Sequence, residues 1–403
     1  MAQCTQNNAK MRGSVVESTQ VFQEKDKMYE FFLAVLDYLF SAFVITPCVV
    51  GCWRSQWQLM DIYCYPEDKV LSASISTAIG FCGNLMLNFI QKPMDQTFHP
   101  DTNRVLYYVV SRTYSTVYAF VCVNWFRGVW QLLDIFTPGD LLPVALSTAG
   151  AMVILAAFRS LRNISSPPLV VATDERHGYF QVLTMFRTSS SERKKLYILD
   201  CIFSTAGIGT FVVAAWRGGF QLLDLLIFPD NKLISYWVTL GLGYIIVTIA
   251  FSLQTAVRWI CKHLKIIPRL IFGDTFILFS ATGTINIWRG MWDLLDHYFL
   301  PDQQELSCWL VYWVSLIFLI ILGCSNSLLV RGVFIDAEEP GGDSMIFPCH
   351  YIRNILSKQR NRKNLAVLQQ AAARANAEID DKSKKDNHNF NYVHSVQMKE
   401  YSA

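Results

Sequence analysis

Four short stretches of this chain combine an arginine, an amide or a second acid, and an aspartate with large aromatic residues. They read WRSQWQLMD, FRGVWQLLD, WRGGFQLLD and WRGMWDLLD, and a proline follows each within a few residues. Guanidinium and carboxylate groups can pair with each other, hold a small polar ligand or bind an ion. In a helix the residues at i, i+4 and i+7 share one face, and the aromatic residues at i−1 and i+3 lie on the neighbouring face. Each motif therefore predicts a polar stripe beside an aromatic one.

The four motifs supply a balanced set of charges. The twelve polar positions are Arg54, Gln58, Asp61, Arg127, Gln131, Asp134, Arg217, Gln221, Asp224, Arg289, Asp293 and Asp296. Because each arginine has its own aspartate, little charge is left for a substrate, and we expect a structural network of salt bridges between the repeats. The alternative is a polar ring that holds a small ligand or ion. Asp293, which replaces the amide in the fourth copy, is then the position that best suits a cation.

The composition of the chain indicates a membrane protein. Of its 403 residues, 52% are hydrophobic and 17% are charged, whereas soluble domains carry about 25% charged residues. The formal net charge of +3 is too small to indicate a nucleic-acid partner. Residues 1–28 are mostly polar and do not resemble a secretory signal. The lipid bilayer is therefore the expected partner.

The predicted fold is all-α, a polytopic membrane protein with eight transmembrane helices. Apolar runs of spanning length occur at 31–53, 70–90, 105–126, 141–158, 197–216, 233–257, 271–288 and 306–330. Each motif begins near the end of an odd-numbered run, and the apolar residues before its arginine are too few to cross the hydrocarbon. We therefore expect each odd-numbered helix to continue through its motif, with the arginine in the outer leaflet.

The motif spacing predicts four helical-hairpin repeats, arranged as two parallel four-helix halves. Arg54 precedes Arg127 by 73 residues and Arg217 precedes Arg289 by 72, but 90 residues separate Arg127 from Arg217. The extra residues form a loop between the halves. The expected organisation is a cytoplasmic N-terminal tail (1–29), a first half of two hairpin repeats (30–158), a cytoplasmic loop (159–196), a second half of two hairpin repeats (197–330) and a cytoplasmic tail (331–403).

The distribution of Lys and Arg sets the orientation. Most of them lie in the tails and the long loop, on the side of both termini, and the positive-inside rule makes this side cytoplasmic. The sequon at Asn163 then faces the cytoplasm and should remain unmodified. The tail is expected to form a basic helix near 351–379 and to be disordered beyond it. The basic residues of that helix, which suit anionic inner-leaflet lipids or a partner, are Arg353, Lys358, Arg360, Arg362 and Lys363.

Several other residues allow either a structural or a functional interpretation. Asn84 and Asn88 share a face of the second run; a substrate could bind there, but we expect hydrogen bonds between helices. Cys64 and Cys308 both fall on the outer side and could form a disulfide. The chain has no catalytic, cofactor-binding or metal-binding motif. We therefore expect a protein that is not an enzyme and uses no cofactor.

The cytoplasmic ends of the odd-numbered helices also carry charges. They are Asp37, Arg112, Asp200 and Asp274. A proton or ion relay is one interpretation; helix-end charges, with Arg112 paired to an acid, are the other. The apolar and basic stretch 179–187 of the long loop could lie along the inner membrane surface.

The repeated W-R-G-x-W-Q-L-L-D motif and the eight predicted spans resemble the fuseless family of invertebrate multi-pass membrane proteins. The resemblance covers about residues 30–335. It implies a presynaptic plasma-membrane protein that organises voltage-gated calcium channels at active zones and supports evoked neurotransmitter release. Calcium channels or active-zone proteins are the partners that it implies. The residues themselves leave two functions open: a membrane scaffold, and a transporter or receptor for a small polar ligand or ion.

Overall fold

A computed structural model describes residues 27–174, 178–189, 193–336 and 340–373. These residues divide into a compact unit that ends at His350 and a second unit that begins at Tyr351. All regular structure in the described residues is helical. The predicted all-α fold is therefore confirmed, and the disordered end predicted for the tail lies outside the described residues.

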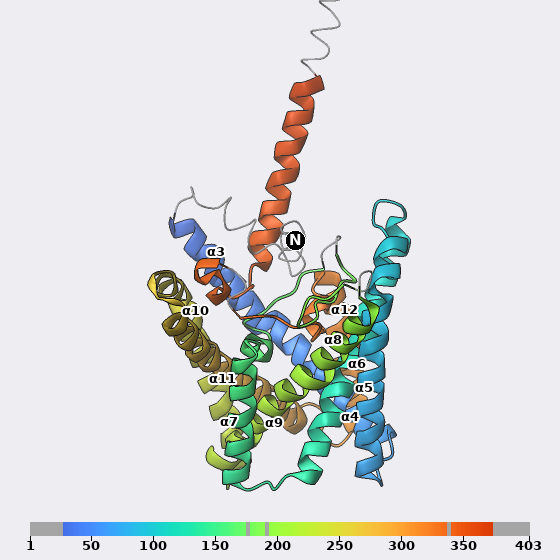
Figure 1. Ribbon diagram of the computed structural model, residues 1–403, viewed down its shortest axis with the longest axis vertical. Coiled ribbons are helices and arrows are strands. Elements are labelled where there is room, and N and C mark those ends of the chain that lie inside the picture. Colours follow the sequence, from blue (N-terminus) through green and yellow to red (C-terminus); the bar gives the residue numbers. More distant parts are fainter. Residues whose placement is uncertain (1–26, 175–177, 190–192, 337–339, 374–403) are drawn as a thin grey trace, which may run out of the picture. The chain divides into compact units, whose positions relative to one another are not determined.

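The helices of the compact unit alternate along the chain with short turns and two longer segments (Figure 1). We call these two segments the inner segments; they lie within residues 158–193 and 323–350. The turn from α6 to α7 lies at the bottom of the unit in Figure 1, and the start of α3 lies at the top. The long helical segments are α3 (Lys27–Phe40), α4 (Thr46–Tyr63), α5 (Lys69–Thr97), α6 (Arg104–Phe136), α7 (Leu141–Ala157), α8 (Lys194–Ile202), α9 (Gly209–Leu226), α10 (Lys232–His263), α11 (Ile266–Tyr298) and α12 (Gln304–Leu322).

The helices that carry the four motifs, here called the motif helices, are α4, α6, α9 and α11. Two of them are preceded by a π-helical segment. The segment η2 (Ser41–Ile45) joins α3 to α4, and η4 (Phe203–Ile208) joins α8 to α9, so each pair forms one continuous helix. The two segments lie at corresponding distances before Arg54 and Arg217. The other two motif helices, α6 and α11, are uninterrupted. The helices of the first and third motifs therefore share the same irregularity, and such π-bulges often occur at functional sites.

Six helical segments are long and apolar enough to cross a membrane. They are Met28–Tyr63, Lys69–Thr97, Lys194–Leu226, Lys232–His263, Ile266–Tyr298 and Gln304–Leu322. The apolar helix α7 is shorter, and α6 has 33 residues but includes Arg112 and Arg127, which lower its hydropathy. These segments fit a multi-pass membrane protein.

The last helix ends earlier than the sequence predicted. We expected an apolar helix over 306–330, but α12 ends at Leu322, and the next residue, Gly323, is left-handed at φ 66°. A glycine in this conformation is a common helix C-terminal signal. The chain then turns into the 3-10 helix η5 (Ser325–Leu328).

The helix that follows each motif packs mainly on the helix that carries the next motif, and the last of them, α12, packs on the first motif helix, α4. The extensive pairs are α5 with α6, α7 with α9, α10 with α11 and α12 with α4. Glycines allow the close approach: a Cβ on Gly80 would lie 2.4 Å from the Trp125 backbone, and one on Gly128 would lie 2.4 Å from the Thr77 backbone. The hairpin that is repeated in the sequence is therefore not the pair of helices that packs most closely.

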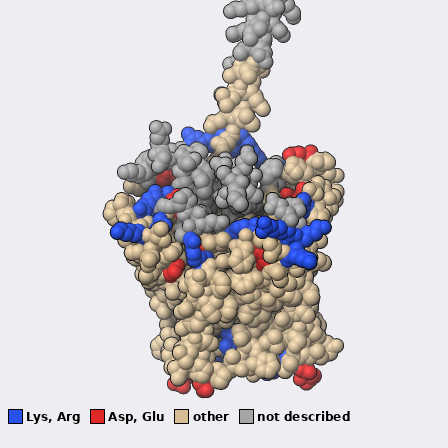
Figure 2. All heavy atoms as spheres, viewed as in Figure 1, with Lys and Arg blue, Asp and Glu red and all other residues tan. Residues whose placement is uncertain are grey.

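Charged side chains are unevenly distributed on the face shown in Figure 2. Lys and Arg gather toward one end, Asp and Glu mark the opposite edge, and a broad belt between them is almost uncharged. The basic residues at the corresponding helix ends include Lys92, Arg104, Lys194, Lys195, Arg258, Lys262, Lys265 and Arg269. An apolar belt between two charged ends is typical of a membrane-embedded protein.

Most of the stretch 179–187 is packed inside the protein, although we expected it along a membrane surface; Phe186 is exposed. Tyr179 and Phe180 are 3% and 1% exposed, and the Phe180 ring lies 5.0 Å from the ring of Tyr114. Their aromatic area is removed from solvent inside the protein. The inner segments therefore belong to the packed core of the compact unit.

The second unit contains one described helix, which covers residues 351–373. It agrees with the helix predicted near 351–379 as far as the described residues extend. Four of its basic residues are exposed, namely Lys358, Arg360, Arg362 and Lys363. Leu365 and Leu368 are also exposed.

Candidate functional site: a ring of arginine–aspartate pairs

Each motif arginine pairs with the aspartate of the motif before it, and the first arginine closes the series by pairing with the last aspartate. The shortest nitrogen–oxygen distances are 2.7 Å for Arg127–Asp61, 2.6 Å for Arg217–Asp134, 2.7 Å for Arg289–Asp224 and 2.6 Å for Arg54–Asp296. The four motif helices α4, α6, α9 and α11 are thus linked in a closed ring.

Three amides strengthen the same links. The side-chain nitrogens of Gln58, Gln131 and Gln221 donate to Asp296, Asp61 and Asp134 at 2.6, 2.8 and 2.8 Å. In each case the acceptor is the Oδ1 atom that also binds the arginine. Each of these three aspartates therefore holds a guanidinium and an amide from one neighbouring helix.

Asp293 breaks the pattern at the fourth link. A carboxylate cannot donate to Asp224 as a glutamine would, and Asp293 Oδ2 instead lies 3.8 Å from Nε of Arg289. Arg289 therefore faces two acids, at a shorter distance to Asp224. Among the described residues no cluster of three or more His, Cys, Asp or Glu side chains suits a metal ion.

The two kinds of charge in the ring differ in exposure. The arginine side chains are 1–3% exposed, whereas the four aspartates are 36–59% exposed. The guanidinium groups depend on the ring for compensation, but each carboxylate also meets solvent. A buried charge without a partner is strongly unfavourable. Loss of an aspartate should therefore lower the stability of the protein more than loss of an arginine.

Hydroxyl groups complete two of the four arginine sites. Arg127 donates to the hydroxyls of Ser72 and Ser76 on α5, and Arg289 donates to those of Ser235 and Thr239 on α10. In the sequence, Ser72 and Ser76 belong to a stretch of small residues that suits close helix packing or a path lined with hydroxyls, and neither interpretation placed them beside an arginine. The i, i+4 spacing that the hydroxyls share, one turn of helix in each half, was the signal for a polar role.

The other two arginines keep an unpaired nitrogen. Nη1 of Arg54 and Nη2 of Arg217 are buried and have no hydrogen-bond partner among the described residues. These arginines belong to the two helices with π-helical segments. The additional contacts of the arginines therefore alternate around the ring: Arg127 and Arg289 bind hydroxyls, and Arg54 and Arg217 each keep an unpaired nitrogen.

Aromatic side chains of the motifs meet inside the ring in two layers. In the inner layer Trp53 lies 5.0 Å from Phe126 and 5.7 Å from Trp288, which lies 5.2 Å from Trp216. In the outer layer the equivalent contacts are Trp57–Trp130 at 5.5 Å, Trp57–Trp292 at 5.8 Å and Trp130–Phe220 at 5.3 Å. Mostly edge-on rings, a favourable geometry, thus fill the space between the motif helices.

The inner segments attach to this aromatic cluster. Indole nitrogens of Trp53, Trp216 and Trp288 donate to the carbonyls of Leu328, Ile164 and Pro167 at 3.1, 3.1 and 2.8 Å. Leu328 and Ile164 end the 3-10 helices η5 and η3 (Leu161–Ile164). Backbone carbonyls from each half therefore reach the tryptophans of the other half.

Two buried aspartates hold the inner segments in a reciprocal way. The Asp174 carboxylate accepts from the backbone of Ser325 and Asn326 at 3.1 and 2.8 Å. The Asp336 carboxylate accepts from the backbone of Leu161 and Arg162 at 2.7 and 3.0 Å. Asp174, which follows the first two motifs, thus caps η5 near the end of the compact unit. Asp336, which follows the last two motifs, caps η3.

Burial raises the pKa of both Asp174 and Asp336, and the backbone hydrogen bonds and nearby arginines act in the opposite direction. Arg112 lies 3.2 Å from Asp174, so this arginine has the acidic partner that we expected for it. Neither of the buried aspartates was identified from the sequence, since both lie in segments without a motif.

Among the remaining helix-end charges, Asp200 holds the loop through hydrogen bonds. Oxygens of Asp200 accept from the hydroxyls of Thr184 and Thr188, each at 2.7 Å, and from the backbone of Phe186 at 3.0 Å. Asp200 therefore fastens the inner segment to α8. Asp37 is 1% exposed and Asp274 lies on α11.

Cys64 and Cys308 are not joined by a disulfide, which corrects that alternative. Both are free thiols. Cys308 is fully buried and its sulfur lies 3.0 Å from the Gln58 oxygen, while Cys64 caps the end of α4. The buried sulfur is thus directed at the ring and not at the outer turn.

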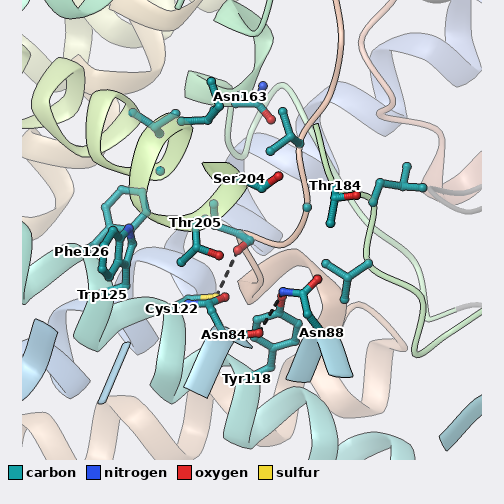
Figure 3. A pocket seen from close by; sticks show the side chains of 18 residues that line it. Asn84, Asn88, Tyr118, Cys122, Trp125, Phe126, Asn163, Thr184, Ser204 and Thr205 are labelled. Carbon is teal, nitrogen blue, oxygen red and sulfur yellow. Dashed lines mark hydrogen bonds between the residues drawn. The ribbon is translucent and has the colours of Figure 1, made fainter. Parts of the chain in front are cut away.

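Asn84 and Asn88 also differ from expectation. Their side-chain nitrogens donate to the carbonyls of Gly80 and Asn84 at 2.8 Å, within α5, and not to another helix. Both line a cavity of about 60 Å³ between α5, α6 and η4 (Figure 3).

A protein-family model described as Fuseless matches residues 32–329. The match confirms the resemblance noted in the sequence and covers all four motifs. No curated protein and no solved structure matches the chain.

Proposed function

Because the chain belongs to the Fuseless family, we propose that it is a multi-pass membrane scaffold that organises voltage-gated calcium channels at presynaptic active zones. Evoked neurotransmitter release would depend on it through those channels. The family supports this role, and the residues of the ring support its structural part.

The single observation that carries the scaffold proposal is the closed ring of arginine–aspartate pairs. All four arginines contact an aspartate, and aromatic rings from the four motifs pack between the helices. A transporter needs a site that substrate can reach from either side of the membrane. Neutralised charges and packed aromatic rings favour a rigid scaffold over such a path.

The membrane arrangement that we propose has eight spans, in four hairpins and two parallel halves, with both termini cytoplasmic. α6 is less apolar than the other long helices, but its Arg127 is 1% exposed and faces the ring rather than lipid. α7 has 17 residues, a length of about 26 Å, close to the roughly 30 Å of the hydrocarbon. The distribution of basic residues supports the orientation.

The helix at residues 351–373 is the surface that we propose for partner contact. It exposes Lys358, Arg360, Arg362 and Lys363 together with apolar Leu365 and Leu368. A basic helix suits anionic inner-leaflet lipids, and its apolar residues suit a channel or active-zone protein. Clustering in the presynaptic plasma membrane would follow from such contacts.

Channel clustering in neurons tests the scaffold. Neurons that lack the protein should recover clustered calcium channels when they express the full chain but not when they express a chain that ends at His350. A matched variant that replaces Lys358, Arg360, Arg362 and Lys363 by glutamine separates the basic residues from the rest of the tail. Normal clustering with the shortened chain would reject docking through this helix.

Transport is tested with the same protein in proteoliposomes. The scaffold proposal expects no uptake of small polar solutes or cations above that of empty liposomes, and no difference between the wild type and Asp293→Asn. Uptake that Asp293→Asn reduces would favour a transporter instead, since Asp293 is the one acid of the ring without its own arginine.

A further inference from the structure

The helix at residues 351–373 carries positive charge and no negative charge (Figure 1). Its basic residues are Arg353, Lys358, Arg360, Arg362 and Lys363, and it contains no aspartate or glutamate. Lys358 and Arg362 stand at i and i+4, where like charges destabilise an isolated helix. Negative charge from a partner would offset this repulsion and stabilise the helix.

Exposed apolar side chains stand on both sides of the basic stretch 358–363. Before it, Ile355 and Leu356 are 39% and 38% exposed; after it, Leu365 and Leu368 are 56% and 66% exposed. Apolar surface gains free energy when a partner removes it from water. The helix therefore offers one apolar pair at each end of a basic centre.

The two apolar pairs face opposite sides of the helix. Successive residues of an α-helix are about 100° apart around the axis and about 1.5 Å apart along it. Leu356 and Leu365, nine residues apart, are thus separated by about 180° and about 14 Å. Ile355 and Leu368, thirteen residues apart, are separated by about 220° and about 20 Å. A partner that covers both pairs has to contact the helix from two sides.

Basic side chains interrupt the apolar side of Leu356. Arg360 and Lys363 follow Leu356 at i+4 and i+7, so all three share one face. Val367 lies on the same face one turn further along. Two cations therefore separate the apolar residues of this face. A helix that lies along a membrane surface keeps its charges on the face opposite its apolar residues, so the apolar residues here do not form one lipid-binding face.

We propose that the helix at residues 351–373 binds an acidic protein with two apolar grooves, which close around the helix from opposite sides. One groove takes Ile355 and the other takes Leu368, while acidic residues at the groove rims face the basic centre. Calcium sensors of the EF-hand type present such chemistry: Ca²⁺ opens an apolar groove in a helix pair, and grooves of this kind bind amphipathic helices. Binding should therefore require Ca²⁺.

This inference rests on the proposed function, in which the same helix contacts a partner, and it names the class of that partner. The binding experiment uses purified protein without channels, so its failure would reject a two-groove partner and leave the scaffold intact. Normal channel clustering with the chain that ends at His350 would reject docking through the helix in neurons and leave the binding result intact.

Fluorescence anisotropy of labelled calmodulin tests the proposal, with the full-length protein in phosphatidylcholine nanodiscs. The wild type should bind saturably with Ca²⁺, and EGTA should abolish binding. Ile355→Gln and Leu368→Gln each remove one anchor and should weaken binding about tenfold or more, as the loss of a central apolar contact does. A chain that ends at His350 should not bind.

Val367→Gln is the matched control for Leu368→Gln. Both residues are exposed, at 63% and 66%, and they are neighbours in the chain, but Val367 lies on the side of Leu356. Val367→Gln should change the affinity less than about twofold. A helix that lay flat with Leu356 toward lipid would use Val367 rather than Leu368, so the order of the two variants separates the two arrangements.

Insertion of one alanine between Asn361 and Arg362 tests the spacing of the anchors. The insertion keeps every side chain but turns Leu368 by about 100° relative to Ile355. The affinity should fall about tenfold because the two anchors no longer reach their grooves together. Attraction between charges alone would be unchanged by the insertion.

Several outcomes would overturn the proposal. They are the absence of saturable binding with Ca²⁺, unchanged binding in EGTA, binding by the chain that ends at His350, equal losses with Val367→Gln and Leu368→Gln, and wild-type affinity of the insertion variant. Loss of binding when the nanodiscs contain phosphatidylserine would show that anionic lipid takes the helix instead. Gel filtration establishes that each variant is folded before binding is measured.

Discussion

At the scale of single residues, burial gives the two members of each ion pair different importance. Arg127 is 1% exposed but Asp61 is 42% exposed. Removal of the arginine leaves an acid that water can solvate, whereas removal of the acid leaves a guanidinium inside the protein. This difference in exposure cannot be predicted from the equal numbers of arginines and aspartates in the motifs.

Asp61→Ala should therefore lower stability more than Arg127→Met. A buried charge without its partner costs about 3–5 kcal/mol, and the effect should appear as a large fall in the midpoint of thermal unfolding. The double variant should be more stable than Asp61→Ala alone, because it removes the unpaired cation. Equal effects of the two single changes would show that both charges are solvated.

The pair Arg258–Asp343 is a control for that prediction, because the Arg258 side chain is 25% exposed and that of Arg127 is 1% exposed. Ion pairs that water reaches contribute about 0–1 kcal/mol. Arg258→Met should therefore change the unfolding midpoint little. A fall as large as that of Asp61→Ala would mean that burial does not explain the difference.

Asp336 should make stability depend on pH. Burial raises its pKa above that of the unfolded chain, so the folded protein holds the proton more tightly. Its contribution to stability is full below the ordinary carboxyl pKa and is lost as the pH rises through the raised value. The unfolding midpoint of the wild type relative to Asp336→Asn should increase on acidification across that range. A constant difference would contradict the prediction.

At the scale of elements, close helix packing decides which elements form pairs. The turn after each motif joins a hairpin, yet the extensive contacts link α5 with α6 and α10 with α11. Equivalent glycines stand at both of these interfaces: a Cβ on Gly80 or on Gly243 would lie 2.4 or 2.6 Å from backbone atoms of the facing helix. Backbone cannot move aside as a flexible side chain can.

Gly80→Ala should separate α5 from α6 and reduce the yield of folded protein. The new methyl group would overlap the Trp125 backbone, and overpacking typically costs about 1–3 kcal/mol or more. Gly241→Ala is the matched control, because nothing lies within 4 Å of its added Cβ. Fluorescence gel filtration of detergent extracts compares the two. Equal yields would place α5 and α6 farther apart than described.

At the scale of the whole molecule, the two halves are joined by exchanged contacts. Asp174 follows the first half and caps η5, while Asp336 follows the second half and caps η3. The salt bridges Arg54–Asp296 and Arg217–Asp134 also connect the halves. The proposed orientation then places this exchange on the cytoplasmic side and the ring near the outer side.

Glycosylation mapping tests that orientation. A long polar loop with an Asn-Gly-Ser sequon, inserted between Thr137 and Asp140, should be glycosylated in eukaryotic cells. The native sequon at Asn163 should remain unmodified, since its amide nitrogen donates to the Ser160 and Phe334 carbonyls in the folded protein. A glycosidase-sensitive mass shift reports each site. Modification of Asn163 with none at the insert would reverse the orientation.

The helical character, the motifs and the family can be read from the amino-acid sequence alone. Apolar runs of spanning length, arginine and aspartate at i and i+7, and the repeated motif are local patterns, and local patterns are enough to place residues on one helix face. The family match over residues 32–329 includes all four motifs. The local patterns also predicted that motif charges would be paired, but not in which order.

Which groups contact one another can be seen only in the folded protein. A single sequence does not reveal that Arg54 contacts Asp296, more than 240 residues away, nor that Ser72 and Ser76 bind Arg127. The end of α12 at Leu322, the burial of Tyr179 and the polar cavity beside Asn88 are of the same kind. Each depends on the distance between elements remote in the chain, and packing rather than local propensity sets that distance.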